Sequence, residues 1–293
     1  CGDDHSTSMK LSAGEICPSA NTSLYNGRDD SVINGEWYYS GGYYSYIEPV
    51  NNTAVTDEQG RNTVYIYAIS DTSKQTRYLE YNTGTKKYEK KSIDEGKAFG
   101  IHGSTTWDMP WYEVDGNEVI DSKITVNGDV NLILKDGCKL EANGGITVTE
   151  GSSLTVYGQT KGTGELIAKS TDIHYAAIEV GEGAAMTVYS GKITATGGSV
   201  AAGIGGGYEG NGGNIAVYGG AVIAVSGQNA GGIGGGSGCT SHGELTLTDD
   251  LIIIAGDTSD DSRLVTAAEY KERRSHYVFM HLHNFTGGTC AYC

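Results

Sequence analysis

The sequence predicts an all-β protein whose central part is a right-handed parallel β-helix of about five coils. A Gly-Ile-Gly-Gly-Gly segment at residues 203–207 recurs at residues 232–236. Short segments around both copies alternate apolar and polar residues, and this period of two is that of a strand rather than a helix. Glycine is also abundant, with 45 of 293 residues against 3 prolines, but it lacks the period of three that collagen requires. Glycine is therefore expected at tight, repeated turns.

The repeat predicts which side chains fill the interior of the helix. Each copy holds two or three short strands separated by turns, about 22 to 32 residues in all, which suits one coil. A single coil cannot bury its own apolar face, so successive coils must stack and align equivalent residues. One interior column is expected to contain Ile146, Ile178, Ile204 and Ile233. A second is expected to contain Leu154, Met186, Ile215 and Leu245.

Three regions follow from where the repeat begins and ends. Residues 118–258 carry the repeat and are assigned to the β-helix. Residues 1–117 contain tyrosine-rich segments divided by turn signals, which predicts an antiparallel β-domain that caps the amino end or recognises a ligand. Residues 259–293 are expected to form a small cap, with a short helix after the capping box that begins at Thr266 and then a strand.

The repeat region resembles a group of bacterial surface proteins. The residues that carry this resemblance are Ala-Gly-Ile-Gly-Gly-Gly at 202–207 and Val-Tyr-Gly-Gly at 217–220. Together with the rest of 118–258 they resemble the glycine-rich repeats of secreted surface proteins of gut and rumen Firmicutes. Such regions are often described as carbohydrate-binding domains with a pectin-lyase-like β-helix. The resemblance implies an extracellular, cell-surface location and contact with a polysaccharide or a host glycan, but no agreed chemistry.

Charge and motif content exclude several classes of function. The formal net charge is −16, with 36 acidic and 20 basic residues, which disfavours a nucleic-acid partner. No apolar run reaches the length of a transmembrane segment. The glycine-rich turns lack the Lys-Ser/Thr pair of a phosphate-binding loop and the strand–turn–helix context of a dinucleotide site, so they are interpreted as structural corners.

The cysteines point to an oxidising compartment. An even number of cysteines in such a chain is typical of a secreted protein with disulfide bonds, although the pairing is not readable from sequence. Cys1-Gly2-Asp3-Asp4 resembles the start of a processed bacterial lipoprotein, so Cys1 is either a lipid anchor or a free or disulfide-bonded residue. The six cysteines are Cys1, Cys17, Cys138, Cys239, Cys290 and Cys293.

Aromatic residues near the amino end are the candidates for glycan recognition. Sugar rings pack their C–H faces on Trp and Tyr side chains, and an excess of exposed Tyr is typical of recognition surfaces. The same residues would also suit packing between subunits or capping of the β-helix, and the sequence does not separate these roles. The candidates are Trp37, Tyr38, Tyr39, Tyr43, Tyr44, Trp107 and Trp111.

Two clusters near the carboxyl end are candidate structural metal sites. His281, His283, Cys290 and Cys293 form a His-x-His…Cys-x-x-Cys pattern that provides four ligands for tetrahedral zinc. A Cys290–Cys293 disulfide or another cysteine pairing is the alternative. Asp257, Asp260 and Asp261 form an acidic loop that either binds calcium or is simply solvated.

No arrangement of residues indicates an enzyme. A nucleophile–base motif is missing, and no facing pair of carboxylates for sugar hydrolysis can be placed. The leading hypothesis is a non-catalytic extracellular surface protein that binds glycans or mediates adhesion. A structural subunit that polymerises end to end in a surface filament or layer is the alternative. A polysaccharide lyase or hydrolase is the least favoured hypothesis.

Overall fold

The computed structural model describes residues 75–94 and 97–282, together with the backbone of four short strands outside these ranges. By its internal contacts the chain divides into two units, Cys1–Gln75 and Thr76–Cys293. Strands β1 and β2 form one antiparallel pair, and β26 and β27 form another. The bounds of these four strands are β1 (Glu36–Ser40), β2 (Tyr43–Ile47), β26 (Phe285–Thr286) and β27 (Thr289–Cys290).

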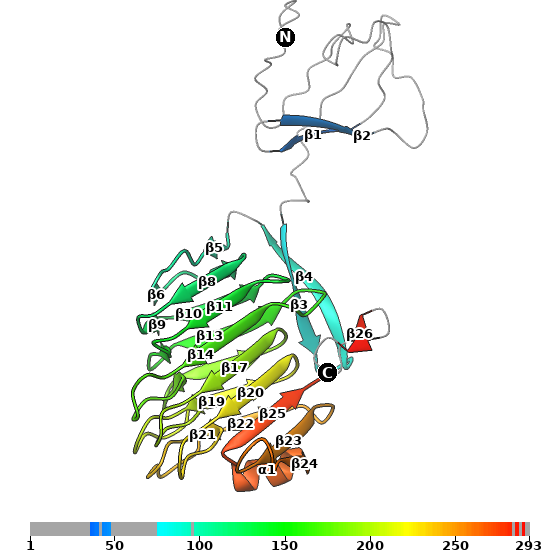
Figure 1. The fold of residues 1–293 in the computed structure, drawn as a ribbon. Helices are drawn as coiled ribbons and strands as arrows, with labels where there is room; N and C mark the ends of the chain where they lie inside the picture. Colours follow the sequence, from blue (N-terminus) through cyan, green and yellow to red (C-terminus); the bar gives the residue numbers. More distant parts are fainter. Residues whose placement is uncertain are drawn as a thin grey trace, which may run out of the picture. The chain divides into compact units, whose positions relative to one another are not determined.

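The second unit is a parallel β-solenoid of about five turns, which confirms the predicted parallel β-helix (Figure 1). Its strands stack into three sheets, in which strands of successive coils are parallel and in register except at one end of the third sheet. The first sheet contains β5 (Phe99–Gly100), β7 (Trp111–Val114), β10 (Asp129–Leu134), β13 (Ser153–Gly158), β16 (Ala185–Val188), β19 (Asn214–Val217) and β22 (Leu245–Leu247). The second contains β6 (Thr106–Trp107), β9 (Ile124–Val126), β12 (Ile146–Val148), β15 (Ile178–Val180), β18 (Ile204–Gly205) and β21 (Ile233–Gly234). The third contains β8 (Asn117–Ile120), β11 (Lys139–Ala142), β14 (Glu165–Lys169), β17 (Lys192–Thr196), β20 (Ala221–Val225), β25 (Tyr277–His281), β23 (Ile252–Gly256) and β24 (Arg263–Val265).

Both interior columns predicted from the repeat are confirmed. The members of each column are buried and face one another across successive parallel strands. A buried aliphatic side chain of this size contributes about 1.5–3 kcal/mol relative to an exposed one, so the columns supply much of the stability of the stack. The first column is Ile146, Ile178, Ile204 and Ile233 in the second sheet. The other is Leu154, Met186, Ile215 and Leu245 in the first sheet.

The glycine corners allow neighbouring coils to approach closely, and Gly205 is the clearest case. Its φ of +135° lies in a region that other residues rarely adopt. A Cβ atom at Gly205 would lie 1.8 Å from the carbonyl oxygen of Gly234 in the next coil. The two glycines are direct partners in the parallel register. The repeat of Gly-Ile-Gly-Gly-Gly is therefore required by coil-to-coil packing.

Aromatic side chains close both ends of the apolar interior. Trp107 in the first coil is fully buried, and its indole N–H donates to the carbonyl oxygen of Ser104. Helix α1 (Ala267–Arg273) covers the other end and buries Tyr270. The Tyr270 hydroxyl accepts the backbone N–H of Ile233, and Arg274 donates to the carbonyl oxygen of the same residue. The polar backbone of the last turn is therefore paired within the chain.

The third sheet ends with a change of strand direction. Strand β25 lies between β20 and β23 and is antiparallel to both. The capping box predicted at Thr266 is present, since its side chain accepts from the N–H of Glu269 and its backbone N–H donates to the Glu269 carboxylate. None of the helices among the described residues combines the length and the hydrophobicity of a membrane-spanning segment.

Parallel pairing begins earlier in the chain than the repeat suggests. Strands β5 and β6 already pair with β7 and β9, although residues 1–117 were expected to form a separate β-domain. These first strands contain Phe-Gly and Thr-Trp in place of the Ile-Thr-Val pattern, which explains why periodicity alone does not reveal them. The antiparallel hairpin of β3 (Gln75–Asn82) and β4 (Lys87–Asp94) also contacts the solenoid directly, through the pairing of Leu79 with Gly158.

The glycine argument predicts a large effect from one added methyl group. We expect Gly205→Ala to lower the free energy of unfolding by more than about 2 kcal/mol, because the new Cβ clashes with backbone and the φ is unfavourable. Gly181→Ala is the matched control, since a Cβ there meets its nearest atom at 3.9 Å. Denaturant unfolding followed by circular dichroism measures both. Equal effects of the two substitutions would contradict the proposed role of close coil contact.

Candidate functional site

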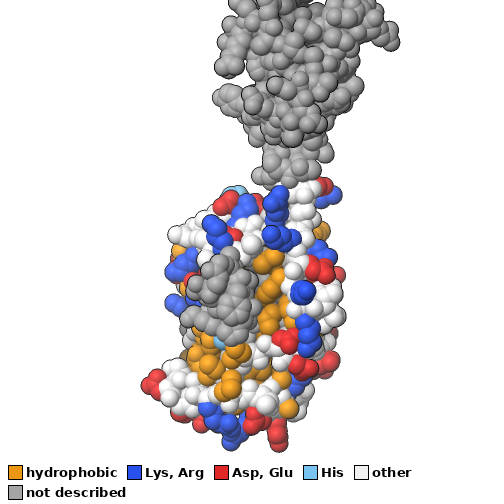
Figure 2. Space-filling model, turned by 90° about the vertical axis from the view of Figure 1, so that its right-hand side faces the viewer, with side chains coloured by type: hydrophobic (Ala, Val, Ile, Leu, Met, Phe, Trp, Pro, Cys, Tyr) orange, Lys and Arg blue, Asp and Glu red, His pale blue; other side chains and the backbone are white. Residues whose placement is uncertain are grey.

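A stack of aromatic rings runs along the outer face of the first sheet. The rings of Tyr157 and Tyr189 are 5.4 Å apart with an interplanar angle of 10°, and Tyr218 continues the stack at 5.4 Å and 27°. Trp111 lies 5.7 Å from Tyr157 at 24°. Figure 2 shows a band of hydrophobic side chains on the face that carries β3 and β4. Because the rings face one another, most of their faces are unavailable to a sugar.

The β3–β4 hairpin fastens this stack to the solenoid. Tyr78 packs against Trp111 and Tyr157, with ring centroids 5.2 and 4.6 Å apart. The buried hydroxyl of Ser190 donates to the carbonyl oxygen of Leu79 in β3 and accepts the N–H of Gly158. Further hydrogen bonds join the hairpin to later coils. They are Gly220 N–H to the Tyr88 hydroxyl, and the Tyr81 hydroxyl to Asp250.

The aromatic residues predicted to bind glycans therefore differ in their location and exposure. Trp107 fills the interior and is 0% exposed, so its prediction as a sugar platform is wrong. Trp111 is only partly buried, but it belongs to the structural stack. The others lie in β1 and β2, where the structure describes only the backbone. They are Trp37, Tyr38, Tyr39, Tyr43 and Tyr44.

The predicted metal ligands that lie within the described residues do not form a metal-binding group. Among residues 75–94 and 97–282, no group of three or more His, Cys, Asp or Glu side chains is placed to hold a metal ion. His281 is buried in β25 and stacks on Phe279. The remaining members of the zinc prediction lie outside the described residues, so that prediction stays untested. They are His283, Cys290 and Cys293.

The acidic loop predicted to bind calcium instead forms part of the turn between β23 and β24. Asp261 accepts the backbone N–H of Thr258, and this hydrogen bond lowers the pKa of its carboxyl. Asp260 accepts a hydrogen bond from Ser259. Neither these two carboxylates nor Asp257 belongs to a group of metal-binding geometry within the part of the chain that the structure describes. Local turn formation accounts for the Asp261 and Asp260 carboxylates.

Two cysteines can be assessed, and both are free. Cys138 is buried, and burial raises the pKa of its thiol to about 11. Cys239 is half-buried, with its sulfur 3.7 Å from Nδ1 of His242. The other four cysteines lie outside the residues whose side chains are described, namely Cys1, Cys17, Cys290 and Cys293. The expectation of disulfide bonds and of a lipid anchor at Cys1 is therefore not tested.

Exposed aromatic side chains occur on loops whose residues were not among the predicted glycan-binding residues. Tyr175 is 42% exposed, Tyr208 is 47% exposed, and Ile173 is 54% exposed. Backbone hydrogen bonds fix the loop, including Tyr208 N–H to the carbonyl oxygen of His174. The rings of His174 and Tyr208 meet edge to face at 5.6 Å. These four residues, with their polar neighbours Lys123 and Glu179, are called the Tyr175–Tyr208 surface.

The polar neighbours complete this surface. The ammonium group of Lys123 lies 3.6 Å from the centre of the Tyr175 ring and 3.8 Å from the Glu179 carboxylate. Glu179 also accepts a hydrogen bond of 3.0 Å from the Thr147 hydroxyl. Hydrogen-bond donors and acceptors therefore lie beside aromatic rings that are partly open to solvent. One signal in the sequence marks this place, because Tyr208 departs from the repeat, which has Ser237 in the next copy.

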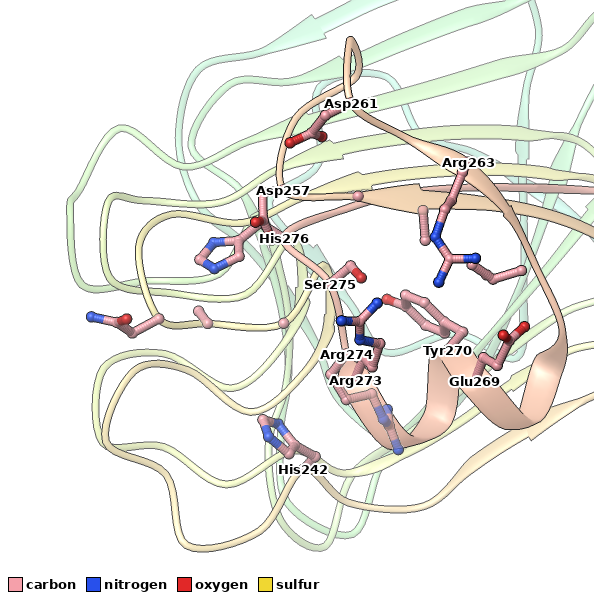
Figure 3. A pocket seen from close by; sticks show the side chains of 16 residues that line it. His242, Asp257, Asp261, Arg263, Glu269, Tyr270, Arg273, Arg274, Ser275 and His276 are labelled. Carbon is pink, nitrogen blue, oxygen red and sulfur yellow. The ribbon is translucent and has the colours of Figure 1, made fainter.

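A polar cavity of about 480 Å³ lies under the carboxyl-terminal cap. Figure 3 shows Arg263 and Glu269 on one side, Asp257 and His276 on the other, and Arg274 between them. Arg274 donates three hydrogen bonds, all to backbone carbonyl groups, those of Lys271, Ile233 and Gly243.

Comparisons with known proteins add no assignment. A scan against protein-family models, a search of curated proteins and a search of solved structures gave no match to this chain.

The hairpin contacts predict a measurable cost for losing one hydroxyl group. Ser190→Ala would leave the Gly158 N–H and the Leu79 carbonyl oxygen without a shared partner in a buried place. We expect a loss of about 1–3 kcal/mol in the free energy of unfolding. Ser153→Ala, which removes an exposed hydrogen bond to Asp129, is the control and should change stability by less. An unchanged denaturation midpoint for Ser190→Ala would remove the assigned role.

The pKa of Tyr81 predicts an alkaline transition of the hairpin. Burial and the hydrogen bond to Asp250 raise this pKa to about 12, from an ordinary value of about 10. The contribution of Tyr81 to stability is therefore complete below pH 10 and is lost as the pH rises towards 12, because only the unfolded chain releases the proton in that range. Thermal melts between pH 9 and pH 12 should show a steeper decline for the native protein than for Tyr81→Phe. Parallel declines would contradict the assignment.

Proposed function

We propose that this protein is a non-catalytic, extracellular glycan-binding protein and that the Tyr175–Tyr208 surface is its contact with the glycan. One observation carries the proposal: two exposed tyrosine rings are held on hydrogen-bonded loops next to charged and polar groups. Carbohydrate recognition needs this combination, because a sugar presents apolar C–H faces and hydroxyl groups together. A surface on ordered loops also costs little conformational entropy when the ligand binds.

The charges of this surface favour a neutral glycan. Asp172 and Glu179 are acidic neighbours, and Glu209 accepts a hydrogen bond from Tyr208 that raises the pKa of that tyrosine. Lys123 is the cation closest to Tyr175, and it already pairs with Glu179. An acidic polysaccharide would meet repulsion here, since the carboxylates outnumber the cation. The negative charge of the whole chain acts in the same direction.

The extracellular location and the cell-surface role rest on the resemblance of the repeat region to secreted bacterial proteins. A surface protein of this kind would use its solenoid as a rigid support and present loops to a polysaccharide or a host glycan. End-to-end polymerisation has less support, because Trp107 and helix α1 close the interior at both ends of the coil stack. In the third sheet, a polymer that continues the parallel ladder would also have to displace the antiparallel strand β25.

Substitution of the two tyrosines tests the proposal. A glycan array on the full chain identifies the ligand, and isothermal titration calorimetry then measures its affinity for Tyr175→Ala and Tyr208→Ala. Each substitution should weaken binding by about tenfold or more, as removal of a stacking ring usually does. Phe99→Ala is the matched control, because Phe99 is 43% exposed and lies in the first coil.

Two outcomes would contradict the proposal. One is the absence of any glycan ligand for the native protein. The other is a ligand whose affinity is the same for the native protein and for both tyrosine variants. Circular dichroism spectra and melting temperatures of all variants show whether a loss of binding reflects a loss of folding.

A further inference from the structure

The cavity under the carboxyl-terminal cap has the dimensions of a small-molecule site. Its volume of about 480 Å³ falls within the range of roughly 300–1,000 Å³ found for ligand pockets. None of its lining residues belongs to the Tyr175–Tyr208 surface. Helix α1, strand β24 and the loop after the helix supply most of the charged side chains. The cavity is therefore a separate place on the protein with its own chemistry.

The wall of the cavity contains a buried positive charge. Arg274 is 9% exposed, and its guanidinium group donates only to backbone carbonyl oxygens. No carboxylate lies within ion-pair distance of it among the described residues 75–94 and 97–282. Burial lowers the pKa of this guanidinium, which reflects the cost of a charge removed from water. Buried charges in proteins are ordinarily balanced by an opposite charge nearby.

Two further arginines at the rim have unused donors. Arg263 and Arg273 line the cavity, and neither side chain makes a hydrogen bond or a close ion pair within the described part of the chain, although Glu269 lies near enough to attract both charges. Each guanidinium offers five N–H donors in a fork that matches a carboxylate. In Figure 3 the Arg263 side chain extends over Tyr270 towards the centre of the cavity.

Three carboxylates line the same cavity, and one of them, Glu269, lies on the arginine side. Glu269 accepts from the backbone N–H and the hydroxyl of Thr266 through one carboxylate oxygen, and these hydrogen bonds, followed by the charges of Arg263 and Arg273, lower the pKa of its carboxyl. Asp261 accepts the backbone N–H of Thr258. Asp257 lies on the side of the cavity opposite Arg263 and next to His276 (Figure 3). The arginine side of the cavity therefore holds three guanidinium groups and one carboxylate, and a ligand with a negatively charged acceptor group satisfies its spare donors best.

We propose that this cavity binds a small carboxylate of the size of a sugar acid, with Arg263 and Arg273 holding the carboxylate group. Arg274 supplies positive charge from the wall, and Asp257 with His276 can accept or donate hydrogen bonds to hydroxyl groups at the opposite side. The neutral His242 ring fits this arrangement, because burial and the charge of Arg274 lower its pKa. Uronic acids combine one carboxylate with several hydroxyl groups and match this distribution of donors and acceptors.

Calorimetric titration of the full chain with glucuronate, glucose and inorganic sulfate tests the proposal. Glucuronate should bind, glucose should bind at least about tenfold more weakly, and sulfate should not match glucuronate, because it lacks the hydroxyl groups. Arg263→Gln and Arg273→Gln should each weaken glucuronate binding by about tenfold or more. Lys271→Gln is the matched control, since it removes one positive charge from the same helix without touching the cavity lining.

The results separate this proposal from that of the Tyr175–Tyr208 surface. Glucuronate affinity should be unchanged in Tyr175→Ala, whatever that substitution does to glycan binding elsewhere. The proposal is overturned if glucuronate does not bind, if glucose binds equally well, if sulfate binds as tightly, or if Lys271→Gln weakens binding as much as the two cavity variants. Melting temperatures show whether each variant remains folded. Because two arginine positions are tested separately, the proposal can still be judged if one variant does not fold.

Discussion

In-register pairing between successive coils is the constraint on which the rest of the structure depends. When parallel strands stack without a shift, each position of one coil lies directly over the same position of the next. This rule builds the isoleucine column of the second sheet and the tyrosine stack outside the first. It also brings Gly205 so close to Gly234 that no side chain fits between them. The buried isoleucine column, the outer tyrosine stack and the close contact of the glycine corners therefore all result from the same in-register alignment.

The apolar interior of the coil stack must be covered at its ends, and contacts between residues far apart in the chain cover it and also join the coils along one side. Trp107 and Tyr270 occlude the apolar interior, while Arg274 and the Tyr270 hydroxyl pair with backbone groups of the last turn. The β3–β4 hairpin joins early and late coils through Ser190 and through the Tyr81–Asp250 hydrogen bond.

The two candidate binding regions occur where the chain departs from its own repeat. Tyr208 stands where the next copy has Ser237, and the arginines of the cap cavity follow the last coil. A residue at a repeated position must stack on the equivalent residues of both neighbouring coils. A residue that differs from the repeat is not bound by this requirement and can serve a binding role. Conversely, several residues that looked functional have structural roles. Trp107 fills the interior, Trp111 joins a ring stack, and Asp261 shapes a turn.

The sequence by itself determined the architecture of the coils, because strand periodicity and a glycine repeat are local signals that survive stacking. It predicted the isoleucine column residue by residue and the capping box at Thr266. Only the tertiary structure decided which aromatic rings are exposed, since alternation within a strand cannot show what covers its outer face. The hairpin that packs against the tyrosine stack and the loops that expose Tyr175 are set by contacts between residues far apart in the chain. The cavity under the cap arises in the same way, from groups that meet only when the last coil closes.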